Sequence, residues 1–332
     1  MSTLGTTAAT LMDLGKRLDP DGQIAKIIEI LNDQNEVLLD MGFVEGNLPT
    51  GHKTTVRTGL PSVAWRLLNY GVPPSKSRTA QVTDTCGMLE AYAEVDKSLA
   101  DLSGNAAAFR LSEDRAFIEA MNQEVASTLF YGNTATNPQR FLGLAPRYNL
   151  STAENGANII KGDGTGSANT SIWLVCWGDL TCHGIYPKGS KAGLSFRDLG
   201  EQTLLDGATP QGRFQGYRSH YKWDLGLTLR DWRFAVRIAN IKVADLTKGA
   251  TAGSDLIDLM TQALEIPPNL NLGRPAFYCN QTVRSVLRRQ IANKVSASTL
   301  TMDAVAGKHV IGFDGIPVRR CDAILNTEAT VA

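Results

Sequence analysis

The chain has no excess of charge of either sign: 33 Lys and Arg balance 33 Asp and Glu among its 332 residues. Proteins that bind DNA tightly are usually basic, because most of their affinity comes from neutralising the phosphates of the DNA. A container that holds DNA without binding it along its length needs no such charge. Long apolar runs are also missing, since no window approaches ~18 unbroken apolar residues and no leader-like segment opens the sequence. We therefore expect no membrane contact and a chain that is soluble when made.

Cysteine and histidine are scarce, with five Cys and four His. The odd number and scattered spacing of the cysteines are typical of buried, reduced thiols in a protein made in a reducing cytoplasm. Cys176, Cys182 and His183 lie close together in the sequence, but no second pair of ligands follows them. Zinc sites need about four ligands, usually in two tight pairs, so we expect no metal site.

No catalytic constellation is visible. The four histidines lie in different segments, and no serine stands in a G-x-S-x-G elbow. Gly162, Gly164 and Gly166 lack the residue order of a phosphate-binding loop. We therefore predict that the chain is not an enzyme and binds no cofactor. Its length and 43% hydrophobic content permit a sizeable core, and its mixed periodicities favour an α+β fold.

The most informative stretch covers residues 111–144. Apolar side chains at helical spacing, such as Phe117 and Met121, predict a long amphipathic helix. Ser112 is its predicted N-cap, and Gly132 is expected to end it in the left-handed conformation. An amphipathic helix is most often an ordinary core helix, so the periodicity alone assigns no function.

A second informative stretch covers residues 46–85. Residues 52–58, 63–68 and 78–85 each have strand character and are separated by segments rich in Gly and Pro. Few of these positions could fill a core, so we predict a long projecting hairpin rather than a compact sheet. A solvated hairpin without a partner is the alternative.

Further elements are predicted along the chain. Residues 23–40 form an amphipathic pattern that could dock on a neighbouring subunit or on its own domain, and residues 88–96 form a half-buried strand or a short helical approach. The remaining predictions are a short helix within 97–109, strands at 172–177 and 276–279, a helix at 255–264, and a helix capped by Asn280 that continues to about Ile291.

Residues 210–240 mix basic and aromatic side chains, as segments that bind single-stranded nucleic acid do. Asp224 and Asp231 interrupt the positive charge, and the apolar residues alternate as they do in strands. We therefore favour sheet structure, with arginines such as Arg230 and Arg237 at subunit contacts.

The order of these features resembles the major capsid proteins of tailed bacteriophages, which share the Hong Kong 97 phage capsid fold. A hairpin-like region precedes the long helix, Tyr131-Gly132-Asn133 ends it, and Phe141-Leu142-Gly143-Leu144 follows. Residues 314–318 and 322–324 are similar to the end of the family's axial domain. The resemblance covers about residues 45–328 and is greatest to the capsid proteins of podophages that infect Bordetella.

The resemblance implies a Hong Kong 97-like α+β fold in four parts. These are an N-terminal arm (1–45), an extended β-hairpin loop (46–85), a peripheral domain (86–175) with a spine helix at 112–131, and an axial domain with a central sheet and the remaining peripheral strands (176–332). The subunit-interface candidates lie in the extended loop and are Lys53, Arg57, Trp65, Arg66, Tyr70, Lys76 and Arg78.

The implied function is that of a major capsid protein that self-assembles as hexamers and pentamers into an icosahedral shell around double-stranded phage DNA. The implied partners are further copies of the chain, scaffolding, portal and decoration proteins, and packaged DNA through non-specific contacts. The implied location is the virion capsid, assembled in the host cytoplasm. Two alternatives remain: a bacterial nanocompartment shell of the same fold, and an α+β enzyme whose site is assembled from distant residues.

Overall fold

The computed structural model describes residues 35–205, 212–246, 255–292, 300–305 and 308–332. Most of the predicted N-terminal arm, and most of the amphipathic pattern at 23–40, lies outside the described residues. The described chain divides into two compact units. Unit 1 contains Met88–Val125 and Gly193–Asp224, and unit 2 contains Gln34–Gly87, Ala126–Ala192 and Leu225–Ala332.

Unit 1 combines strands with two helices. Its elements, some of which continue into unit 2, are β3 (Arg78–Asp96), α3 (Lys97–Leu102), α4 (Ala106–Tyr131), β7 (Ser195–Leu205) and β8 (Arg213–Leu229). β8 lies between β7 and β3, and β7 and β8 form an antiparallel hairpin. Ala93 of β3, Met121 of α4 and Tyr221 of β8 form one apolar cluster, so α4 covers one face of these strands.

Helix α4 covers the predicted long helix but differs from the prediction at both ends. Its side-chain cap is Asn105, whose Oδ1 accepts a hydrogen bond from the Ala108 N–H at 3.1 Å. The N-cap prediction for Ser112 is wrong: this residue lies inside the helix, where its hydroxyl donates to the Phe109 carbonyl. Gly132 does not adopt a left-handed φ. Glycine is needed there because a Cβ would lie 2.3 Å from the Phe141 carbonyl oxygen.

Unit 2 is built on a sheet whose central strand, β5, is buried along all nine residues. β5 pairs antiparallel with β9 on one side and β10 on the other; β4 continues parallel beside β9, and β13 parallel beside β10. The strands of unit 2 include β1 (Phe43–Glu45), β2 (Gly51–Gly59), β4 (Ile159–Lys161), β5 (Asn169–Trp177), β6 (Cys182–Tyr186), β9 (Ala235–Lys242), β10 (Arg274–Cys279), β11 (Leu300–Val305), β12 (Lys308–Phe313) and β13 (Ile316–Arg320).

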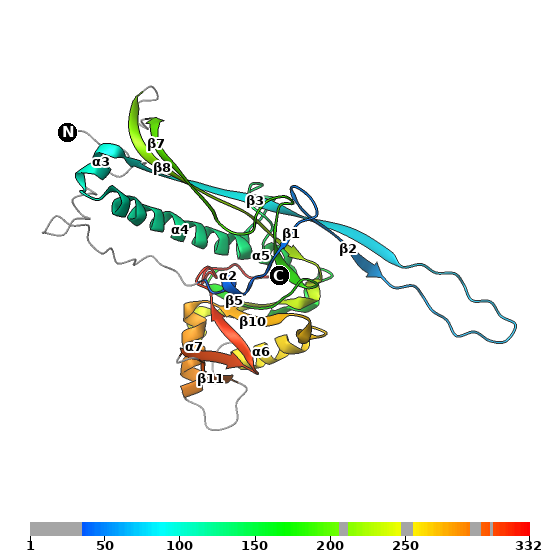
Figure 1. Cartoon of the computed structure of the whole chain (residues 1–332). Helices are drawn as coiled ribbons and strands as arrows, with labels where there is room; N and C mark the ends of the chain where they lie inside the picture. Colours follow the sequence, from blue (N-terminus) through cyan, green and yellow to red (C-terminus); the bar gives the residue numbers. More distant parts are fainter. Residues whose placement is uncertain (1–34, 206–211, 247–254, 293–299, 306–307) are drawn as a thin grey trace. The chain divides into compact units, whose positions relative to one another are not determined.

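Helices cover both faces of this sheet. α6 and α7 pack on one face, where Leu174 and Phe277 contribute to the main apolar cluster (Figure 1). On the other face, the Trp173 ring packs against Phe130, in the last turns of α4, and against Tyr148. The helices that lie wholly in unit 2 are α2 (Val37–Asp40), α5 (Leu144–Arg147), α6 (Leu256–Glu265) and α7 (Gln281–Ala292), with 3₁₀ turns at Gly156–Asn158, Trp232–Phe234, Val243–Asp245 and Leu270–Leu272.

Most predicted elements are confirmed, but two strand predictions are wrong. Residues 63–68 form no strand, because no segment that the structure describes offers them a ladder of backbone partners. Residues 232–234 form a 3₁₀ turn, capped by the Asp231 carboxylate, before β9 begins. Strands predicted at 52–58, 78–85, 88–96, 172–177 and 276–279, and helices predicted within 97–109, at 255–264 and after Asn280, are all present.

Candidate subunit interface

The β2–β3 hairpin of unit 2 carries all seven interface candidates. β2 and the first part of β3 pair antiparallel from Gly51 opposite Thr85 to Gly59 opposite Arg78, with one irregularity between Arg57 and Gly59. Residues 60–77 form the loop that joins them at the far end of the hairpin (Figure 1). Lys53 and Arg57 lie on β2, Arg78 begins β3, and Trp65, Arg66, Tyr70 and Lys76 lie in the loop.

The loop exposes seven large apolar side chains within thirteen residues, 60–72. The Trp65 side chain is as exposed as in an extended peptide, at 104%, and Val63 is 91% exposed. The other exposed apolar residues of the loop are Leu60, Leu67, Leu68, Tyr70 and Val72. Single exposed apolar residues are common, but a contiguous exposed group marks an interaction surface. We call residues 60–72 the apolar tip.

The five basic candidates have no acidic partner within the described chain. Lys53, Arg57 and Arg78 line the strands, and Arg66 and Lys76 lie in the loop; all five are exposed, and none forms an ion pair with a described residue. Exposed cations on a projecting hairpin are suited to orienting an acidic partner, because such charges contribute more to specificity and encounter rate than to affinity.

The base of the hairpin is held by a buried ion pair that the sequence analysis did not identify. Asp84 of β3 accepts a hydrogen bond from Arg147 Nη2 at 2.7 Å, and their side chains are 3% and 12% exposed. The same guanidinium nitrogen also donates to the carbonyls of Leu142 and Leu227. The only sequence signal was an acidic residue within a strand pattern, which does not indicate its distant partner.

Close backbone packing also fixes the base. A Cβ on Gly51 would lie 2.0 Å from the Asp84 carbonyl oxygen, and one on Gly226 would lie 2.7 Å from the Thr85 carbonyl oxygen. Only glycine permits these approaches without a shift of the strands. The hairpin is therefore anchored tightly at its base, whereas the large apolar side chains of its tip are exposed.

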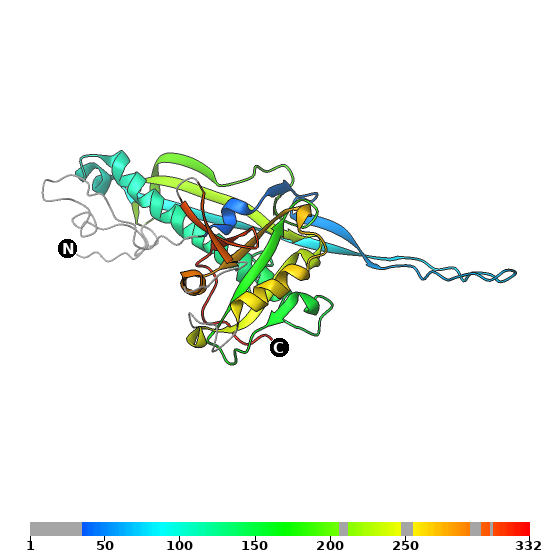
Figure 2. The ribbon, with the colours of Figure 1, turned by 90° about the horizontal axis from the view of Figure 1, so that it is seen from below.

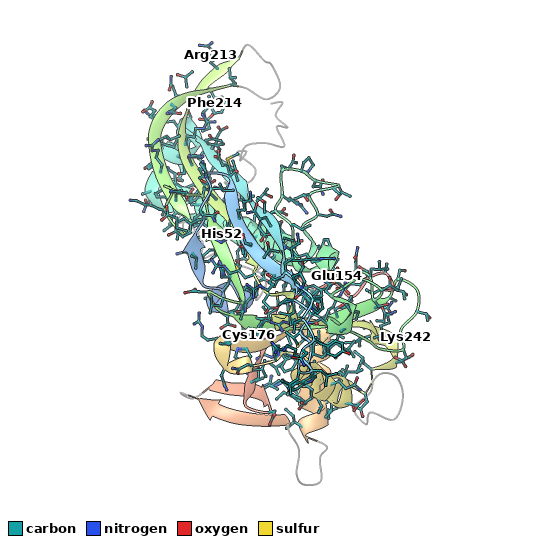
Figure 3. All side chains as sticks on the ribbon, turned by 90° about the vertical axis from the view of Figure 1, so that its right-hand side faces the viewer. His52, Glu154, Cys176, Arg213, Phe214 and Lys242 are labelled. Atoms are coloured by element: carbon teal, nitrogen blue, oxygen red, sulfur yellow. The ribbon has the colours of Figure 1, made fainter. Side chains whose placement is uncertain are left out.

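Two buried histidines lie near the Asp84–Arg147 ion pair at the base of the hairpin. His52 lies opposite Asp84 in the β2–β3 ladder, and the His52 and His183 rings meet edge to face at 6.0 Å (Figure 3 labels His52). Arg230 Nη2 lies 3.2 Å from His52 Nε2. Burial, and then the Arg230 charge, lower the pKa of both histidines below the usual value. Both imidazole rings therefore stay neutral to a lower pH than free histidine does.

The described part of the basic and aromatic segment, residues 212–240, contains the expected sheet structure in β8 and β9, with the 3₁₀ turn at Trp232–Phe234 between them. Arg213 and Phe214 lie where β8 begins, opposite Leu205 and Leu204 at the end of β7 (Figure 3 labels both), and Arg218 pairs with Glu94 at 2.9 Å. The prediction that places Arg237 at a subunit contact is wrong. Its side chain is buried and pairs with Glu328 at 2.9 Å, which leaves no charge for a neighbour.

None of the five cysteines forms a disulfide; four are buried, as predicted, and Cys86 is partly buried. Within the described residues, no group of three or more His, Cys, Asp or Glu side chains is arranged to hold a metal ion. None of the described helices combines the length and apolar character needed to cross a membrane.

The comparisons with known proteins agree with this geometry. The family model described as major capsid protein GP7 matches residues 19–332. The structure is similar to a chain of bacteriophage Epsilon15, at 38% identity and a TM-score of 0.80, with 100% of this chain and 99% of that chain covered. No curated protein matches the chain.

Two more distant structures are also similar to the chain at a lower level. The bacteriophage JBD30 capsid has 10% identity and a TM-score of 0.48, covering 89% of this chain and 92% of that chain. The capsid of a native GTA particle has 11% identity and a TM-score of 0.45, covering 68% and 96%. Both are too distant to support a conclusion of their own.

The chain combines helices and sheets with a projecting hairpin, and a phage structure matches it over its whole length. These features define a viral shell protein with the Hong Kong 97-like capsid fold. The chain belongs to the major capsid protein GP7 family, and it is a structural component of a tailed-phage virion capsid.

Proposed function

We propose that copies of this chain assemble as hexamers and pentamers into an icosahedral shell that encloses double-stranded phage DNA. The observation that carries the proposal is the apolar tip, which has no covering partner within the described chain. Trp65, Val63 and their neighbours would be covered if the tip lay on an adjacent copy. Many identical contacts of this kind convert weak pairwise binding into a stable closed assembly.

The seven interface candidates have separate roles in this arrangement. Trp65 and Tyr70 are the apolar anchors, because large aromatic side chains dominate the energetics of interfaces. Lys53, Arg57, Arg66, Lys76 and Arg78 orient the hairpin against acidic groups of the neighbour. The anchored base, with Arg147 and Asp84, keeps the hairpin in one direction, so less order is lost on binding.

The proposed division of labour follows the four predicted parts. The arm (1–45) and the extended loop (46–85) clamp neighbouring subunits, the helix at 112–131 provides a rigid beam, and the C-terminal region surrounds the local symmetry axis. The role of the chain is mechanical rather than catalytic. Scaffolding, portal and decoration proteins, non-specific contact with DNA, assembly in the host cytoplasm and a relation to Bordetella podophages stay predictions.

Negative-stain electron microscopy tests the proposal. The chain is expressed alone and then together with the products of neighbouring genes, and closed particles or rings of five or six subunits are expected. A monodisperse monomer or dimer under every condition would contradict assembly by this chain. The contents of purified particles then separate the alternatives, because a nanocompartment would hold protein cargo and no genome.

A further inference from the structure

The helices α6 and α7 of unit 2 carry exposed faces of opposite charge. The exposed face at α6 contains carboxylates and no cation: Asp255, Asp258, Thr261, Gln262 and Glu265. The solvent-facing residues of α7 contain cations and no carboxylate: Gln281, Arg284, Ser285, Arg288 and Arg289. We call these the acidic face and the basic face.

The basic face borders a pocket. Five α7 residues and Arg320 of β13 line a hollow of about 410 Å³. Two of its four arginines are already paired: Arg320 with Asp322 at 2.7 Å and Arg284 with Glu36 at 3.5 Å. Arg288 and Arg289 are exposed and form no ion pair within the described chain. The pocket therefore retains positive charge that its own unit does not neutralise.

The acidic face is likewise unneutralised. Asp255 accepts backbone N–H groups at the start of α6, and Asp258 accepts a hydrogen bond from Gln262 at 2.7 Å. No described Lys or Arg pairs with Asp255, Asp258 or Glu265. Charges of one sign gathered on one face without counter-charges are suited to a partner of the opposite sign.

The two helices that carry these faces pack beside opposite halves of the sheet. α6 packs beside β9 and β4, and α7 packs beside β13 and β11, with β5 and β10 between these pairs in the sheet. Figure 2 shows α6 along its length and α7 nearly end-on. A subunit that carries two different, complementary faces can bind the next subunit head to tail, which is the geometry that closes rings.

We propose that the acidic face of α6 in one copy docks on the basic pocket beside α7 in the neighbouring copy. This inference rests on the proposed shell function. It names one contact between neighbouring subunits within each hexamer or pentamer. A second copy fits the pocket better than nucleic acid does. The matching charges lie on the same chain, the chain as a whole is neutral, and Glu36 and Asp322 beside the arginines would repel a phosphate backbone.

Charge reversal tests the contact. R288E/R289E and D258R/E265R are each expected to lower the yield of rings and closed particles by about tenfold or more, because like charges then face one another. The fourfold variant that combines all four changes restores complementarity and is expected to recover the yield. The matched control is K188E/K191E, which makes the same charge change at two exposed lysines of unit 2 outside both faces. It is expected to assemble like the wild type.

A mixture of the two double variants gives a sharper result. One variant then has two acidic faces and the other has two basic faces, so neighbours must alternate around a ring. Alternation closes in a ring of six but not in a ring of five. The mixture is expected to form six-membered rings, detected by electron microscopy, while the five-membered rings needed for closed shells are lost.

The outcomes separate this contact from the shell function. If R288E/R289E assembles like the wild type, the contact is wrong and the shell function stands. If R288E/R289E particles form normally but lose their DNA, the pocket binds phosphates and the contact is also wrong. If the wild type forms no particles, the shell function fails. Sedimentation of the mixed variants then still tests the contact, because it shows whether the two variants associate. A complex that forms at low salt and dissociates at high salt supports it, and two unassociated species overturn it.

Discussion

Arg237 and Glu328 are 91 residues apart in the chain, yet their buried side chains form an ion pair at 2.9 Å. Arg237 Nη1 also donates to the Tyr148 carbonyl, and the Ser171 and Tyr131 hydroxyls donate to the Glu328 carboxylate. The pair thus joins β9 and β5 to the C-terminal segment, and each of its two buried charges has several hydrogen-bond partners.

Glu328→Ala leaves the Arg237 guanidinium buried without its counter-charge. We expect the free energy of unfolding to fall by about 3–5 kcal/mol, measured by urea denaturation of the unassembled chain. Glu154→Ala is the control, because Glu154 is exposed, and a change within about 0.5 kcal/mol is expected. An apolar replacement of both partners, R237M/E328L, should recover most of the loss. Equal stability of E328A and E154A would show that the pair does not hold the C-terminal segment.

Changes at the apolar tip should separate stability from assembly. W65S/L67S removes two side chains that are 104% and 72% exposed, so the unfolding free energy should stay within about 0.5 kcal/mol of the wild type. The yield of particles should nevertheless fall sharply. Leu39→Ser is the control, since Leu39 is 83% exposed on α2, outside the hairpin. Normal particles from W65S/L67S would show that the tip is not a contact.

Two glycines of the hairpin region should respond differently to the same substitution. Gly51→Ala places a methyl group 2.0 Å from the Asp84 carbonyl oxygen, and we expect a loss of about 1–3 kcal/mol in unfolding free energy. Gly71→Ala meets no atom within 4 Å and should be neutral or slightly stabilising. Thermal unfolding of both variants measures the difference. An equally stable G51A would mean that the base of the hairpin adapts easily.

Protonation of His52 and His183 should weaken unit 2. The pKa of each is lowered in the folded state, by burial first and by Arg230 next, so the unfolded chain binds protons more readily. Stability from this source is complete above pH ~6.5, the unfolded value, and is lost as pH falls toward the folded values. H52Q/H183Q should show a flatter decline between pH 7 and pH 5 in urea denaturation. A decline as steep as that of the wild type would assign the effect to other groups.

Four thiols should resist modification until the chain unfolds. Burial raises the pKa of Cys176 to about 11 and those of Cys182, Cys279 and Cys321 to about 12. Because the thiolate is the reactive form, a thiol-exchange reagent at pH 8 should leave these four unmodified in the native chain. In denaturant all five cysteines should react. Rapid native modification of Cys182 would show that β6 opens readily.

Local sequence signals correctly predicted several elements. The apolar run of β5 predicts a buried strand, and Asn280 predicts the start of α7, where its Oδ1 accepts the Val283 N–H at 3.0 Å. Strand character at 63–68 did not produce a strand, because a ladder requires a partner that the loop lacks. Ser112 carried a capping signal, but the helix begins earlier, at the cap supplied by Asn105.

The sequence by itself determined the family resemblance, the α+β class and the projecting hairpin with its seven exposed candidates, because these depend on patterns that neighbouring residues carry. Only the tertiary structure decided which charges are buried and which are free. Arg237 and Arg288 look alike in the sequence, yet Arg237 is buried against Glu328 and Arg288 is exposed on α7. Sequence spacing does not reveal this difference, because it depends on long-range packing of the chain around β5.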